Sequence, residues 1–127
     1  MRSAQTSEVD FDTLAANDDF RYGIDLFNHG FAWEAHEMWE PLWRAAPRER
    51  AERAMLHGFV HAAAAIVKAR SGRIDVARRF VERACKQLAR ATTSIVDGHA
   101  LSAALIAWAD DPARPAPAIA LACSEQT

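Results

Sequence analysis

The residues of this sequence that could carry out chemistry gather in two stretches with helical spacing. His36 and Glu40 are four positions apart, as are His57 and His61, so each pair would project from one side of its own helix. Two such pairs on facing helices could offer three imidazoles and a carboxylate to a divalent metal ion. Glu37 would then serve as a general base. One interpretation of the pattern is therefore a metal-dependent hydrolytic enzyme.

Two tryptophans bracket the first of these pairs. Trp33 and Trp43 fall on the same side of a predicted helix as His36, because successive helical residues are about 100° apart. A tryptophan side chain has a large apolar area that is costly to leave in water. We therefore expect this face to be covered by another part of the chain or by a partner, and the carboxylates beneath it to need hydrogen bonds or counter-charges.

The opposite face of the same predicted helix has the pattern of a core-facing surface. Pro41 lies within this helix, where it removes one backbone donor and favours a kink. Apolar residues nevertheless continue at helical spacing on both sides of the proline. The predicted core face consists of Phe31, Ala35, Met38, Trp39 and Leu42.

The helix that follows is the natural cover for the tryptophan-bearing face. It is apolar or small on every side, a pattern typical of a central helix, and small residues such as Ala54 and Gly58 allow another backbone to come close. Packing this small side against the preceding helix would bring His57 and His61 toward His36. The prediction is a central antiparallel hairpin that buries a His/Glu/Trp cluster of Trp33, His36, Glu37, Glu40, Trp43, His57 and His61.

The fold class predicted from the whole sequence is all-α, a compact bundle of about five helices. Strand signals are nearly absent and alanine is abundant. We expect a flexible N-terminal segment at 1–15, a helical domain at 16–111 and an extended, proline-rich tail at 112–127. Gly30 and Gly72 mark two helix ends. The predicted helices cover approximately 18–29, 31–45, 48–70, 75–91 and 99–109.

Composition limits the setting in which the protein works. The net charge is −2 and no apolar run approaches the about 20 residues of a membrane span, so we expect no membrane partner. Cys85 and Cys123 have no metal or redox spacing, which favours free thiols and a cytoplasmic location. Arginines line the predicted helix at 75–91, but Glu82 interrupts them, so a solvated face is favoured over nucleic-acid binding.

Several motifs of the chain resemble those of one known family. They are Phe27-Asn28-x-Gly30, then Glu34-Ala35-His36-Glu37-x-x-Glu40-x-x-Trp43, then Gly58 with the alanine-rich segment after it, and finally Gly72-Arg73-x-x-x-Ala77-x-x-Phe80-x-x-x-Ala84-x-x-x-Leu88. Over about 20–88 the chain is similar to the family called "domain of unknown function 309". The resemblance implies a small all-helical prokaryotic protein with no established activity, substrate or cofactor.

One departure from that family bears on the metal interpretation. The family often carries glutamine where this chain has His57 and His61. Glutamine is a poor metal ligand but a good hydrogen-bonding partner, so the resemblance favours a polar network or an organic-ligand pocket. Three interpretations of the cluster stay open: a structural network, a ligand or partner pocket, and a metal site. The function we predict is a non-enzymatic binding or protein-interaction module, with a homodimer as one form of partnership.

Overall fold

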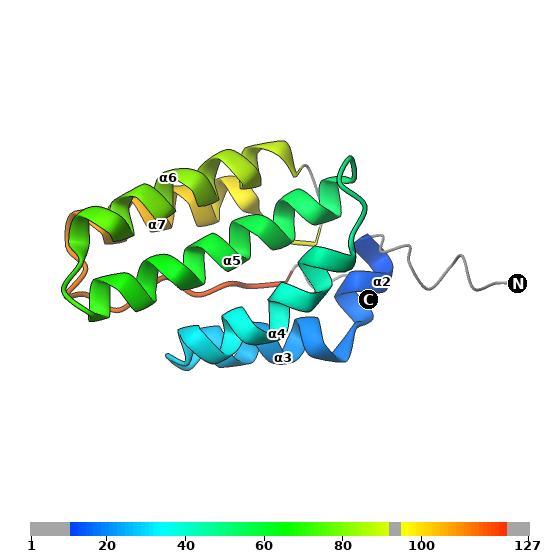
Figure 1. The fold of residues 1–127 in the computed structure, drawn as a ribbon, viewed down its shortest axis with the longest axis horizontal. Helices are drawn as coiled ribbons and strands as arrows, with labels where there is room; N and C mark the ends of the chain where they lie inside the picture. Colours follow the sequence, from blue (N-terminus) through cyan, green and yellow to red (C-terminus); the bar gives the residue numbers. More distant parts are fainter. Residues whose placement is uncertain (1–10, 92–94, 122–127) are drawn as a thin grey trace, which may run out of the picture.

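The all-α prediction is confirmed by the computed structural model, which describes residues 11–91 and 95–121 (Figure 1). In this part of the chain there are six helices, and the only β-type pairing is an isolated bridge between Val96 and Leu121. All five predicted helices are present, with ends within a few residues of those expected. The helices are α2 (Phe11–Ala16), α3 (Asp18–Asn28), α4 (Ala32–Ala45), α5 (Ala51–Arg70), α6 (Ile74–Arg90) and α7 (Gly98–Asp110).

Helix α2 was not predicted. It occupies the end of the segment 1–15 that was expected to be flexible, and its Leu14 is fully buried in the core. Residues 1–10 of that segment lie outside the described part of the chain. Phe11, Leu14 and Ala15 have the spacing of one helical face, but six residues are too few to identify a helix, because apolar periodicity is judged over windows of about 11–18 residues.

The local signals at the other helix ends act as expected. The side chain of Asn17 caps α3, because its Oδ1 accepts a hydrogen bond from the backbone N–H of Phe20 at 2.9 Å. Gly30 and Gly72 follow α3 and α5 with φ angles of 93° and 81°, a left-handed conformation that glycine adopts without steric cost. Helix α4 runs unbroken through Pro41.

The core is built around α5, which lies between α4 and α6 in Figure 1. The sequence predicted that its small side faces the preceding helix, and this is only partly correct, because His57 stacks on Trp43 of α4 whereas Gly58 faces α6. A methyl group added at Gly58 would lie 2.9 Å from Leu88 Cγ and 3.3 Å from the carbonyl oxygen of Ala84. The small residues therefore allow close packing of α6, and α4 meets α5 along a neighbouring side.

Trp39 joins three helices and is fully buried. Its Nε1 donates a hydrogen bond to the carbonyl oxygen of Phe20 at 3.2 Å. Its ring packs 5.8 Å from Phe27 of α3 and 5.1 Å from Phe59 of α5, measured between ring centroids. The indole lies directly against Gly23 of α3, where a side chain would clash with it.

The predicted core face of α4 is only partly correct. Ala35 and Trp39 are fully buried, Met38 and Leu42 are half-buried, and Phe31 is 52% exposed. Phe31 precedes the first residue of α4 and follows the left-handed turn at Gly30. It therefore does not follow the helical wheel on which the prediction was based.

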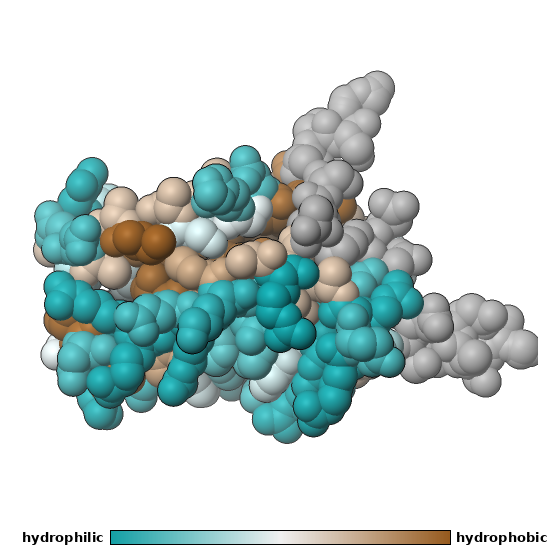
Figure 2. Space-filling view, turned by 90° about the horizontal axis from the view of Figure 1, so that it is seen from above, coloured by the Kyte–Doolittle hydropathy of each residue, from teal (hydrophilic) through white to brown (hydrophobic). Residues whose placement is uncertain are grey.

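Helices α6 and α7 pack side by side and expose different surfaces. Figure 2 shows hydrophilic side chains over one half of this face of the molecule and an apolar band over the other half. Helix α6 exposes charged residues, as predicted, whereas α7 exposes alanines and one large apolar side chain, Ile106. The exposed charged residues of α6 include Arg78, Arg79, Glu82, Arg83, Lys86 and Arg90.

The described part of the C-terminal tail is irregular and docks on the helices. Ile119 is buried, and the side-chain amide of Asn28 binds its backbone twice, donating to Ile119 O and accepting from Ile119 N, both at 2.8 Å. Residues 122–127 of the predicted tail lie outside the described residues. Within the described ranges, no helix has the length and apolarity that crossing a membrane would require.

We predict that Gly23→Ala lowers the free energy of unfolding by about 1–3 kcal/mol, because the new methyl group would overlap the Trp39 indole. Urea denaturation measures this difference. Gly98→Ala is the matched control, since a methyl group there would make only ordinary contacts at 3.5 Å and beyond. Equal stability of the two variants would contradict the close packing of α3 and α4.

Candidate functional site

The seven residues of the predicted cluster are not buried as one group. Trp33 is 53% exposed and Glu37 is also exposed, so the expectation that the hairpin buries both is wrong. His36, Glu40 and Trp43 are half-buried on α4, and the two histidines of α5 are half-buried as well.

Four aromatic side chains form a continuous stack across three helices, which we name the ring ladder: Trp43, His57, His61 and Phe80. Trp43 stacks on His57 with 4.4 Å between ring centroids, and His57 lies 4.2 Å from His61. His61 in turn lies 5.6 Å from Phe80 of α6. The ladder therefore links α4, α5 and α6 through adjacent rings.

A guanidinium group lies over each end of the ring ladder. The Cζ atom of Arg53 is 5.2 Å from the Trp43 ring centroid, and that of Arg83 is 5.4 Å from the Phe80 ring centroid. A cation over an aromatic face is attracted by the electron-rich ring. The same cations oppose a positive charge on the imidazoles between them.

Both histidines of the ladder are held in the neutral form. Burial lowers the pKa of His57, and the nearby charges of Arg53 and Arg90 lower it further. Burial also lowers the pKa of His61 to about 4, with further contributions from His57, Arg83 and His36. Near neutral pH the ladder is thus a stack of uncharged rings between cationic ends.

The four predicted metal ligands do not form one coordination set. The carboxylate of Glu40 accepts a hydrogen bond from Arg44 Nη2 at 2.8 Å, and His57 and His61 pack against each other as rings. Among the described residues, no three His, Cys, Asp or Glu side chains come together in a group that could hold a metal ion. The arrangement of side chains does not support the predicted metal site.

Two polar atoms of the predicted cluster are buried with no hydrogen-bond partner in the described part of the chain. They are His36 Nδ1 and Trp43 Nε1. The His36 ring stacks on the exposed Trp33 at 5.2 Å between centroids. A buried donor without an acceptor costs free energy, so such atoms call for an explanation. Trp43, whose Nε1 is one of these two atoms, lines the cavity described next.

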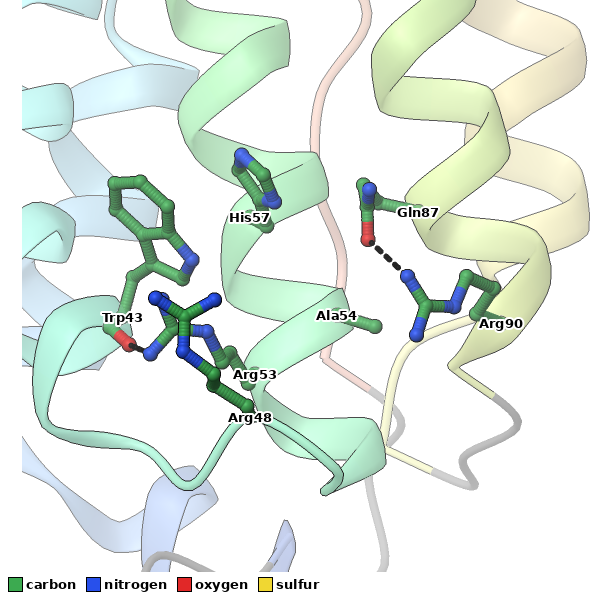
Figure 3. Close-up of a pocket in the computed structure, with 7 residues that line it drawn as sticks. All are labelled: Trp43, Arg48, Arg53, Ala54, His57, Gln87 and Arg90. Atoms are coloured by element: carbon green, nitrogen blue, oxygen red, sulfur yellow. Dashed lines mark hydrogen bonds between the residues drawn. The ribbon is translucent and has the colours of Figure 1, made fainter.

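The ring ladder ends in a cavity of about 530 Å³, which we name the arginine cavity (Figure 3). Trp43, Arg48 and Arg53 lie on one side of it, and Gln87 and Arg90 of α6 lie on the other. Between the two sides, Ala54 and His57 of α5 form the remaining wall. The full lining is Trp43, Arg48, Arg53, Ala54, His57, Gln87 and Arg90.

The lining contains three guanidinium groups and no carboxylate. Arg53 donates through Nη1 to the carbonyl oxygens of Trp43 and Ala46 at 3.0 and 2.9 Å. Arg90 donates to the neutral amide oxygen of Gln87 at 3.4 Å. For Arg48 the described residues show no hydrogen bond or ion pair. None of the three has a carboxylate partner in the described part of the chain.

Neighbouring arginines show that this lack of partners is selective. Arg44 binds Glu40, and Arg50 binds the buried Glu52 through Nε and Nη2 at 3.3 and 3.1 Å. These short-range pairs engage the partly buried carboxylates of this region. Arg44 and Arg50 do not line the cavity. The three arginines that line it have no carboxylate in the described part of the chain to compensate their charge.

Sequence analysis identified Trp43 and His57 but missed the arginines and Gln87. Arg48 and Arg53 fell at the start of the predicted helix at 48–70, and Arg90 on a predicted solvated face. The only available signal was the dense run of arginines between α4 and α5. Nothing in the sequence places Arg90 beside that run, because the close packing of α6 on Gly58 brings them together.

We predict that the free energy of unfolding falls as the pH decreases from 7 to 5, and that His61→Gln reduces this fall. The pKa of His61 is about 4 when folded and 6.5 ordinarily, so in this window the unfolded chain binds more protons. His57 acts in the same direction. Urea denaturation at both pH values tests this, with the exposed His99→Gln as control. An undiminished fall in His61→Gln would contradict the assignment.

The comparison with known proteins can now be set beside this geometry. Residues 20–80 match the model of a family described as Domain of unknown function (DUF309). No curated protein matches the chain. The matched span contains the whole predicted cluster and the part of the arginine cavity contributed by α4, α5 and their connection, whereas Gln87 and Arg90 lie beyond it. Over residues 20–80, this match confirms the resemblance to the DUF309 family that the sequence motifs indicated.

Proposed function

We propose that the protein is a non-enzymatic binding module whose arginine cavity holds a small organic anion. The observation that carries this proposal is the convergence of three guanidinium groups on a cavity that no carboxylate lines. Like charges close together repel one another, and an anion between them removes that repulsion while accepting charge-assisted hydrogen bonds.

The electrostatic state of His57 supports an anionic ligand. Its pKa is lowered by burial and then by the positive charges of Arg53 and Arg90. The charges that make a proton unfavourable on this imidazole make a negative charge favourable in the same space. The cavity therefore combines a positive potential with an uncharged wall.

The size and walls of the cavity favour an organic ligand. Its volume of about 530 Å³ falls in the range of small-molecule sites, about 300–1,000 Å³. The stacked rings of Trp43 and His57 and the methyl group of Ala54 provide apolar surface beside the charged groups. Among these lining residues there is no carboxylate, hydroxyl or thiol, which favours a binding role.

We predict that the protein binds at least one of three anions that share a phenyl group: phenyl phosphate, phenyl sulfate and benzoate. Arg90→Gln should weaken that binding by about tenfold, because a charge-assisted hydrogen bond contributes about 1.5–3 kcal/mol. Isothermal titration calorimetry at constant ionic strength measures it. Arg79→Gln is the matched control, because it removes the same charge from an exposed position of α6 outside the cavity lining.

The two variants separate a specific site from a general charge effect. Arg79→Gln should change the affinity by less than about twofold, since exposed charges at a distance are screened by salt. Equal weakening by both variants would show non-specific attraction. No measurable binding of any of the three anions would overturn the proposed function.

A second copy of this chain is the partner that we propose for the start of α4. Trp33 and Phe31 are 53% and 52% exposed there, and they are two residues apart. Large exposed aromatic side chains are characteristic of interfaces, and a twofold dimer pairs one patch with itself. A cytoplasmic location, expected from the cysteines, stays a prediction.

We predict that the wild-type chain forms dimers and that Trp33→Ser raises the dimer dissociation constant by about tenfold or more, because a buried aromatic anchor contributes over 1.4 kcal/mol. Sedimentation equilibrium over a range of concentrations measures it. Ile106→Ser is the control, since Ile106 is 54% exposed on α7. A wild-type chain that stays monomeric at every concentration would contradict the dimer while leaving the anion site untouched.

A further inference from the structure

We infer that the anionic group recognised by the arginine cavity is a phosphomonoester dianion. This inference rests on the proposed function, since it names the ligand class of the same site. It follows from the number of guanidinium groups, from the separate elements that carry them and from their lack of acidic partners.

The three guanidinium groups come from three different parts of the fold. Arg48 belongs to the connection between α4 and α5, Arg53 to α5 and Arg90 to α6. Figure 3 shows Arg90 across the cavity from the other two. A carboxylate is planar, and its two oxygens suit one guanidinium fork. A phosphate group has three terminal oxygens directed toward different sides, which suits donors that approach from separate elements.

The charge balance points to the same group. A phosphomonoester carries nearly two negative charges above its second pKa of about 6, against three positive charges around the cavity. A carboxylate or a sulfate ester carries one, which would leave two guanidinium charges uncompensated. The nearby Glu40 and Glu52 already bind Arg44 and Arg50, so a dianionic ligand would compensate charge that these two carboxylates do not.

The donors around the cavity have the capacity that this group needs. Among the described residues, Arg53 uses only Nη1, for its two backbone hydrogen bonds, and its other N–H groups have no hydrogen-bond partner there. Arg90 has one hydrogen bond, to Gln87, at the long distance of 3.4 Å. An arginine has five N–H donors, so both side chains can hold an oxyanion without losing the bonds that position them.

Phosphomonoesters occur both on small molecules and at the 5′ end of nucleic acids, and the experiment distinguishes these sources. Phenyl phosphate, phenyl sulfate and benzoate are titrated at pH 8, where the phosphate is a dianion. A short oligothymidylate is titrated with and without a 5′-phosphate. All ligands are tested on the wild type, Arg90→Gln and the control Arg79→Gln.

We expect phenyl phosphate to bind at least about tenfold more tightly than phenyl sulfate or benzoate, and this advantage to disappear in Arg90→Gln alone. Tighter binding of the 5′-phosphorylated oligothymidylate than of phenyl phosphate would assign the dianion to a nucleic-acid end. The reverse order would assign it to a small molecule. Both orders support the phosphomonoester.

Three results would overturn the inference. Benzoate or phenyl sulfate binding as tightly as phenyl phosphate would show an anion site without preference for the dianion, and the proposed function would survive. An unphosphorylated oligothymidylate binding as tightly as the phosphorylated one would show recognition of diesters. If none of the five ligands bound, both the inference and the proposed function would be wrong.

Discussion

The buried indole of Trp39 is the contact on which the rest of the structure depends. It fills the junction of α3, α4 and α5, gives its N–H to the carbonyl oxygen of Phe20 and rests against the bare backbone of Gly23. A large ring with a single hydrogen bond fixes the rotation of α4 about its own axis. Trp43 lies one turn further along α4 and is thereby directed to the flank of α5, where its ring stacks on that of His57.

Helix α5 contributes residues to both the core and the candidate site. Its small residues admit α6 closely, which leaves a strip of half-buried side chains between α4 and α6 that contains His57 and His61. Burial and the surrounding cations keep these imidazoles neutral. They can therefore pack as flat rings, in the way that aromatic residues do. Arg53 connects the two roles, since it caps the end of α4 and also lines the cavity.

Local ion pairing determines which charges reach the arginine cavity. Glu40 and Glu52 lie within four residues of their partners Arg44 and Arg50, so these pairs form at little cost in chain entropy. Glu52 lies four residues from Arg48 and Glu49 four residues from Arg53, but the described residues show no ion pair between a carboxylate and a cavity arginine. Positive charge therefore gathers around this cavity although the net charge of the chain is −2.

The sequence by itself determined five of the six described helices, because apolar periodicity and the glycines at 30 and 72 act within a few neighbouring residues. It also indicated Trp43 and His57 as unusual residues of the second and third predicted helices. Only the tertiary structure decided which side of α5 faces α6, that Trp33 stays exposed, and that Arg90 lies across the cavity from Arg48. Those outcomes depend on packing between residues far apart in the chain, where a glycine and a leucine thirty positions later determine the approach of two helices.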